Sequence, residues 1–97
     1  MAGCSPAWTY TYIDALARAA LAEGMTKKDA VRCAAQAVMG SAQMVLDQID
    51  SAVPTELIDR VTSPGGTTIA GLLAMEEAGF SPAVVAGVRA AVARVKA

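Results

Sequence analysis

A single narrow polar stripe along residues 29–50 is the feature that most constrains the fold. Polar side chains recur there at steps of three and four residues, with Gly40 filling one step: Asp29, Arg32, Gln36, Gln43, Asp47 and Asp50. Because an α-helix has about 3.6 residues per turn, this spacing places all of them on one face. The other positions between residues 31 and 46 are apolar or small, so the helix needs cover on most of its sides. A chain of 97 residues holds little else to cover it, and we expect a second protein surface to do so.

The composition favours helices and excludes several classes of protein. Hydrophobic residues make up 55% of the chain, 22 residues are alanine, and aromatics are only 4%, which argues against both a disordered tail and an all-β domain. A net charge of −1 gives no basic patch, so neither nucleic acid nor a membrane surface is expected as a partner. No uncharged run of about 20 residues could span a bilayer. Residues 1–4 lack the basic start of a signal peptide, so a cytoplasmic location is expected.

The chain has two cysteines, Cys4 and Cys33, and no histidine. Two cysteines are too few for a disulfide framework, and they lack the spacing of metal ligands. We expect two free thiols in a reducing compartment and no metal site. Without histidine, no suitably placed pair of nucleophile and base can be built from this sequence.

Capping signals divide the chain into about four long helices and one short helix, which predicts an all-α bundle. Two Ser-Pro pairs, at Ser5 and Ser81, each predict a Ser N-cap followed by proline in the first turn. Gly24 is expected to end the first helix in a left-handed conformation, and Thr26 to open the second as part of a capping box. The predicted helices are, in order, residues 5–24, 27–48, 54–61, 68–78 and 82–95.

A third Ser-Pro pair opens a segment that differs from the other two. Its sequence is Ser63-Pro64-Gly65-Gly66-Thr67-Thr68. A helix cap does not require two glycines, which are poor helix formers. Two glycines do allow a ligand to come close to the backbone, because they have no side chains. The N–H groups of the last three residues would point at one spot, backed by the positive end of the helix dipole, which predicts a site for a carboxylate or a phosphate. The alternative is a plain N-cap with Thr67 as the capping residue.

The same segment carries a family resemblance. Residues 61–72, VTSPGGTTIAGL, resemble the signature of pyrroline-5-carboxylate reductase, the last enzyme of proline synthesis. Residues 3–8 (GCSPAW), 34–42 (AAQAVMGSA) and 75–80 (MEEAGF) are similar to further elements of that family. The resemblance covers essentially the whole chain. It extends only to the family's C-terminal helical domain, because nothing here encodes the strand–glycine loop–helix unit of its N-terminal Rossmann domain.

The resemblance implies a role for each residue of the segment. In the family, the matching loop receives the substrate carboxylate, to which Ser63 would donate its hydroxyl and Gly66 and Thr67 their backbone N–H groups, with Gly65 completing the loop. Thr68 would place its hydroxyl near the ring nitrogen, as the catalytic residue. The hydride would come from NADH or NADPH on the missing domain, so no cofactor-binding residue is expected in this chain and the chain alone should be inactive.

The resemblance also implies a homodimer, because the family's helical domain interlocks with its two-fold partner; assembly beyond the dimer is left open. Two other functions also stay open: a stand-alone dimerisation module without activity, and a related reductase of a different cyclic imine. The sequence departs from the family at Cys4, at Gln43, where lysine is common, and at Ser81-Pro82, where a basic residue is frequent. None of these lies in the carboxylate loop.

Overall fold

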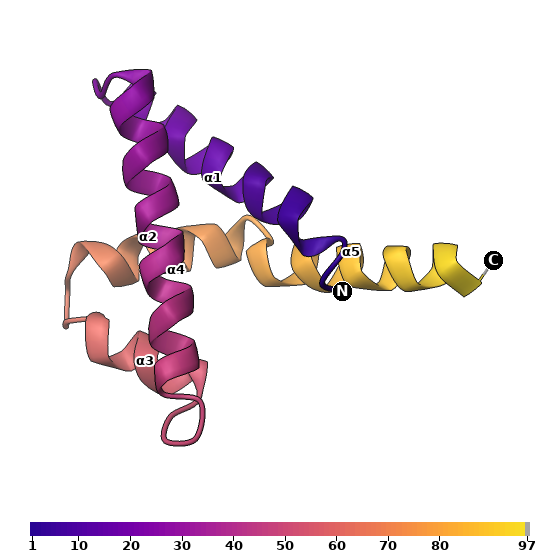
Figure 1. The fold of residues 1–97 in the computed structure, drawn as a ribbon. Coiled ribbons are helices and arrows are strands. Elements are labelled where there is room, and N and C mark those ends of the chain that lie inside the picture. Colours follow the sequence, from indigo (N-terminus) through magenta and orange to yellow (C-terminus); the bar gives the residue numbers. More distant parts are fainter. Residues whose placement is uncertain (97) are drawn as a thin grey trace. The chain divides into compact units, whose positions relative to one another are not determined.

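The computed structural model describes residues 1–96, and Ala97 lies outside the described range. Five α-helices are present: α1 (Ser5–Ala22), α2 (Lys27–Asp47), α3 (Pro54–Val61), α4 (Thr67–Glu77) and α5 (Phe80–Lys96) (Figure 1). The described residues contain no strand, so the predicted all-α class is confirmed. The chain forms two compact units, Met1–Val53 and Pro54–Ala97, and each is described by itself.

The two predicted serine caps are wrong. The first residue of α1 is Ser5 itself, and its hydroxyl donates to the carbonyl of Met1 at 2.8 Å. Ser81 lies inside the first turn of α5, where its hydroxyl donates to Oε1 of Glu76 at 2.7 Å. Each hydroxyl has found an acceptor outside the helix it was expected to cap. The prolines still fall in first turns, where a missing N–H leaves no hydrogen bond unmade.

The connection between α1 and α2 follows the prediction for the end of α1 at Gly24 and for the cap at Thr26, which is one of the two hydrogen bonds of the expected capping box. Gly24 has a φ of +111°, and its N–H donates to Leu21 while the N–H of Met25 donates to Ala20, both at 3.0 Å. This pair of bonds is the Schellman ending that a left-handed glycine allows. The side chain of Thr26 then accepts the N–H of Asp29 at 3.3 Å and caps α2. Glycine and threonine thus stop one helix and start the next within four residues.

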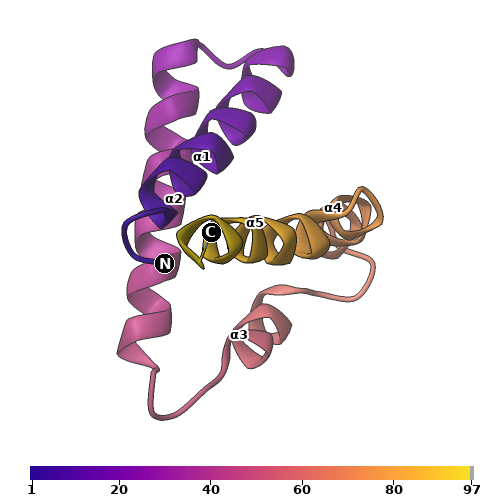
Figure 2. The same ribbon diagram turned by 90° about the vertical axis from the view of Figure 1, so that its right-hand side faces the viewer.

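The first unit is a helical hairpin in which α1 and α2 lie side by side (Figure 2). Its buried core consists of Ala17, Ala30 and Ala34, whose small side chains let the two helices approach closely. No large side chain of the described residues is fully buried. On α2, Met39 and Leu46 remain 62% and 63% exposed. The apolar faces beside the polar stripe therefore find no cover in the hairpin.

The second unit contains α3, α4 and α5. Gly79, with a φ of +97°, separates α4 from α5, whose axes meet at a bend of 49°. The N–H of Gly79 donates to Glu76 of α4, and its carbonyl accepts the N–H of Ala83 of α5, both at 2.9 Å. Glycine is required here because one residue must end a helix in the left-handed region and begin the next.

Within residues 1–96, no single helix is both long and apolar enough to cross a bilayer; α4 and α5 would reach that length and apolar character only as a bent pair.

Candidate carboxylate-binding loop

The loop between α3 and α4 is built on one tight turn. The N–H of Gly66 donates to the carbonyl of Ser63 at 3.1 Å. Pro64 and Gly65 occupy the two central positions, and Gly65 has a φ of +70°. Proline first and a positive-φ glycine second are the residues that a type II turn requires. The first glycine of the segment is therefore explained by backbone conformation.

The turn delivers the chain directly into α4. Gly66, extended at φ −81° and ψ 174°, is the N-cap residue, and Thr67 is the first residue of the helix. The alternative with Thr67 as N-cap is therefore wrong. The N–H groups of Thr67, Thr68 and Ile69 are the first three of the helix and have no acceptor within it. In a helix such groups point along the axis, toward its N-terminal end.

One expected donor is not available. The sequence pattern predicts a free N–H at Gly66, but this group closes the turn onto Ser63. The set of free helix donors is shifted by one residue, from residues 66–68 to residues 67–69. The sequence pattern could not show this, because it places the start of the helix at Thr68 and gives no sign of the turn hydrogen bond.

The second glycine is explained by a close approach. A Cβ atom placed at Gly66 would lie 2.5 Å from Oγ and 3.2 Å from the carbonyl oxygen of Ser63. The hydroxyl of Ser63 therefore stands beside the N-cap residue of α4, the residue whose side chain ordinarily covers the first N–H groups of a helix. This position brings the predicted hydroxyl donor next to the predicted backbone donors.

The loop has no charged side chain of its own, since residues 63–68 contain only serine, proline, glycine and threonine. Attraction for an anion would come from the exposed N–H groups and the positive end of the helix dipole. Ser63, Thr67 and Thr68 are exposed and Gly66 is half-buried. On the other side of the loop, Thr62 donates its hydroxyl to the carbonyl of Ile58 at 3.0 Å, which ties the loop to the last turn of α3.

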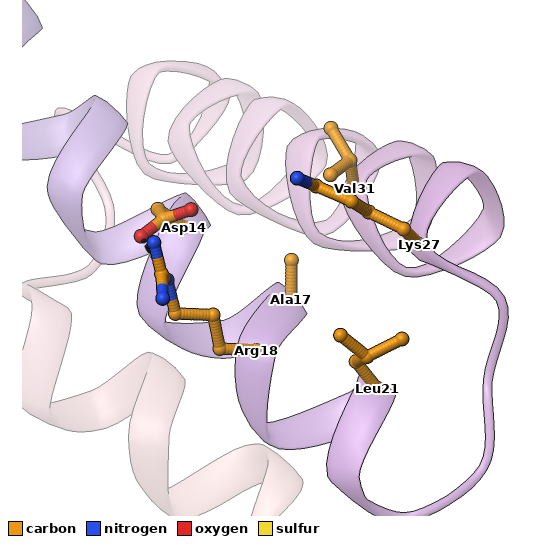
Figure 3. Close-up of a pocket in the computed structure, with 6 residues that line it drawn as sticks. All are labelled: Asp14, Ala17, Arg18, Leu21, Lys27 and Val31. Carbon is orange, nitrogen blue, oxygen red and sulfur yellow. Dashed lines mark hydrogen bonds and ion pairs between the residues drawn. The ribbon is translucent and has the colours of Figure 1, made fainter.

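A second feature lies in the first unit, where sequence patterns gave no signal for a site. It is a shallow hollow between α1 and α2, lined by Asp14, Ala17, Arg18, Leu21, Lys27 and Val31 (Figure 3). The Nε of Arg18 donates to Oδ2 of Asp14, one helical turn away on α1, at 2.7 Å. These side chains are 78% and 57% exposed, so the pair contributes a few tenths of a kcal/mol at most.

The described residues hold no cluster of three or more His, Cys, Asp or Glu side chains that could bind a metal ion. Cys4 and Cys33 are free and exposed, as expected from their number and spacing.

Comparison with other proteins agrees with the resemblance seen in the sequence. The family model for pyrroline-5-carboxylate reductase dimerisation matches residues 1–97. The pyrroline-5-carboxylate reductase of Escherichia coli K12 is 48% identical over 85 residues, which are 88% of this chain and 31% of that protein. The reductase of Methanosarcina acetivorans is 44% identical over 96 residues, 99% of this chain and 35% of that protein.

Two solved structures have the same fold. The 1-pyrroline-5-carboxylate reductase of Streptococcus pyogenes aligns with a TM-score of 0.88 at 37% identity, over 95% of this chain and 35% of that one. The pyrroline carboxylate reductase of Plasmodium falciparum, with NADP bound, gives 0.85 at 33% identity, over 95% and 34%. This chain spans about a third of the length of these relatives. It belongs to the pyrroline-5-carboxylate reductase dimerisation family.

Proposed function

We propose that this chain is the dimerisation and substrate-binding part of a pyrroline-5-carboxylate reductase, which reduces 1-pyrroline-5-carboxylate to L-proline with NADPH or NADH. The observation that carries the proposal is the loop at residues 63–68. A type II turn sets the hydroxyl of Ser63 beside the open N-terminus of α4, in the run of sequence on which the family resemblance rests. Free N–H groups at a helix N-terminus suit a carboxylate.

Three residues of the loop would bind the substrate, and its two glycines would shape the backbone around it. The hydroxyl of Ser63 and the N–H groups of Thr67 and Thr68 would hold the carboxylate, and the hydroxyl of Thr68 would form a hydrogen bond with the ring nitrogen. Gly65 and Gly66 would shape the loop, through a positive φ and a missing side chain. Holding the imine in one orientation is what allows a hydride to reach its carbon atom efficiently.

The nicotinamide cofactor would supply the hydride. The relative from Plasmodium falciparum carries NADP, but the described residues of this chain do not contain the dinucleotide fingerprint. They include no strand, and the dinucleotide fingerprint is a glycine-rich turn between a strand and a helix. No residue of this chain is therefore assigned to the cofactor.

The partner of the chain would be a second copy of itself. Large hydrophobic side chains are exposed on every helix, among them Trp8, Leu46, Ile58, Leu73 and Val84. A core of three alanines is too small to hold a domain of this size together, because burial of large apolar side chains is the main source of stability. Interlocking with a two-fold partner would cover these faces.

A chimeric enzyme tests the proposal. The matching C-terminal third of the Escherichia coli reductase is replaced by residues 1–97, and NADPH-dependent reduction of 1-pyrroline-5-carboxylate is measured. We expect turnover by the chimera and none by the 97-residue chain alone, because only the chimera has a domain that holds the nicotinamide of NADPH beside the imine. A folded, dimeric chimera without turnover would contradict the proposal and favour a dimerisation module without a catalytic role. A six-membered cyclic imine carboxylate in the same assay separates the proposed substrate from a related one.

A further inference from the structure

The two glycines of the loop meet different requirements. Gly65 has a φ of +70°, which any side chain would strain. Gly66 has a φ of −81°, which every residue adopts readily. Its lack of a side chain therefore needs another reason, and that reason is the hydroxyl of Ser63, which occupies space that a Cβ atom would need.

We infer that Gly66 is a positioning residue whose missing side chain lets the hydroxyl of Ser63 lie beside the N-cap position of α4. The inference rests on the proposed function, because it assigns a purpose to the place where that hydroxyl is held. It also replaces the role expected for Gly66 from the sequence, a free backbone donor, since its N–H already binds the carbonyl of Ser63 at 3.1 Å.

The geometry says which atom would move if Gly66 gained a methyl group. The gap of 2.5 Å to Oγ is closer than a carbon and an oxygen tolerate, whereas the gap of 3.2 Å to the carbonyl is tight but bearable. Oγ is the end of a side chain with one free torsion, so rotation about χ1 of Ser63 relieves the clash without unfolding the turn. Gly66→Ala would thus turn the hydroxyl away from the carboxylate while the backbone donors of residues 67–69 stay in place.

The test uses the ¹⁵N,¹³C-labelled 97-residue chain, titrated by NMR with L-proline and with acetate as a bare carboxylate. Four proteins are compared: the unchanged chain, Ser63→Ala, Gly66→Ala and the double variant. We expect each single variant to raise Kd about tenfold, the value of one hydrogen bond to a charged group. The double variant should match Ser63→Ala within about twofold, because without Oγ the methyl group at position 66 has no hydroxyl to displace.

A second readout needs no ligand. The Hα–Hβ couplings of Ser63 report its χ1, and Gly66→Ala should move them to another rotamer. Gly71→Ala is the matched control: it makes the same change within α4, where a Cβ atom meets nothing within 4 Å in the single chain. Once it is shown to dimerise like the unchanged chain, it should leave both the couplings and Kd unchanged.

The outcomes separate the inference from the proposed function. Unchanged Ser63 couplings in Gly66→Ala would overturn the inference alone. A second result would also overturn it: Gly66→Ala weakens binding by the same factor in the unchanged chain and in the Ser63→Ala variant. In that case Gly66→Ala would act on the backbone donors and not through the hydroxyl of Ser63. If neither carboxylate shifts the amide signals of residues 63–69 in the unchanged chain, the carboxylate site itself is wrong and the inference falls with it.

Discussion

At the scale of single residues, Thr68 is the position that distinguishes catalysis from binding. Thr68→Ala in the active chimera keeps the backbone donors and removes the hydroxyl assigned to the ring nitrogen. That hydroxyl should matter most while the imine becomes an amine, so its loss should lower kcat more than it changes KM. One hydrogen bond of this kind is worth about 1.5–3 kcal/mol, which corresponds to a roughly ten- to hundredfold fall in kcat. Steady-state kinetics would measure it, and a kcat within about twofold in a folded dimer would remove Thr68 from the catalytic role.

Ser63 should behave differently under the same assay. Its hydroxyl would hold the carboxylate alike in the bound substrate and in the transition state, so Ser63→Ala removes uniform binding. We expect KM to rise about tenfold while kcat changes little. Ser63→Thr, which keeps the hydroxyl, is the matched control. A fall in kcat at constant KM would mean that Ser63 acts on the reacting ring instead of the carboxylate.

At the scale of the secondary-structure elements, the N-cap of α2 offers a test of local stability. Thr26 accepts the N–H of Asp29 at 3.3 Å, so Thr26→Ala leaves one more N–H of the first turn without a partner. The expected loss is about 1 kcal/mol in the free energy of unfolding, read from urea denaturation followed by circular dichroism. Thr26→Ser keeps the acceptor and should cost much less. Equal losses in both variants would show that the cap hydrogen bond contributes little.

Helix positions were predictable where backbone conformation alone decides them. Gly24 was predicted to end the first helix in a left-handed conformation, and the structure gives it a positive φ. The errors fell where a side chain had a choice of acceptor. Ser5 and Ser81 donate to Met1 and Glu76, respectively, instead of capping their helices, and a sequence pattern does not rank such alternatives.

The candidate loop was predictable in its residues but not in its hydrogen bonds. Two glycines after Ser63-Pro64 indicated an open backbone, which the structure has. That the first would provide a positive φ and the second a space for Oγ depends on where the turn closes. The position of the turn hydrogen bond cannot be read from the sequence. Because that bond uses the N–H of Gly66, the free donors are those of residues 67–69 and not those of residues 66–68.

At the scale of the whole molecule, the chain should be an obligate dimer. The exposed apolar faces and the alanine core leave a monomer without enough buried surface, and interfaces that replace a core commonly bury more than about 2,000 Å². Analytical ultracentrifugation should find the dimer at micromolar concentration, and the unfolding midpoint should rise with protein concentration. A compact folded monomer would contradict this expectation.

Two substitutions on α2 locate the surface that the partner covers. Met39 is 62% exposed in the single chain and lies outside the polar stripe, whereas Gln36 belongs to the stripe. Met39→Lys should weaken or abolish the dimer, since it would bury an unpaired charge. Gln36→Lys should leave the dimer intact. If both variants dimerise as well as the unchanged chain, this face of α2 is not the contact surface.

The hairpin of α1 and α2 also determines the order in which such a chain can fold. Its contacts join neighbouring helices through a four-residue link with a Schellman ending, so it can form within microseconds to milliseconds and independently of dilution. With only three buried alanines in its core, the hairpin alone has little stability. The slow step of refolding is then an encounter between two chains, so the half-time of refolding should halve when the concentration of chains doubles.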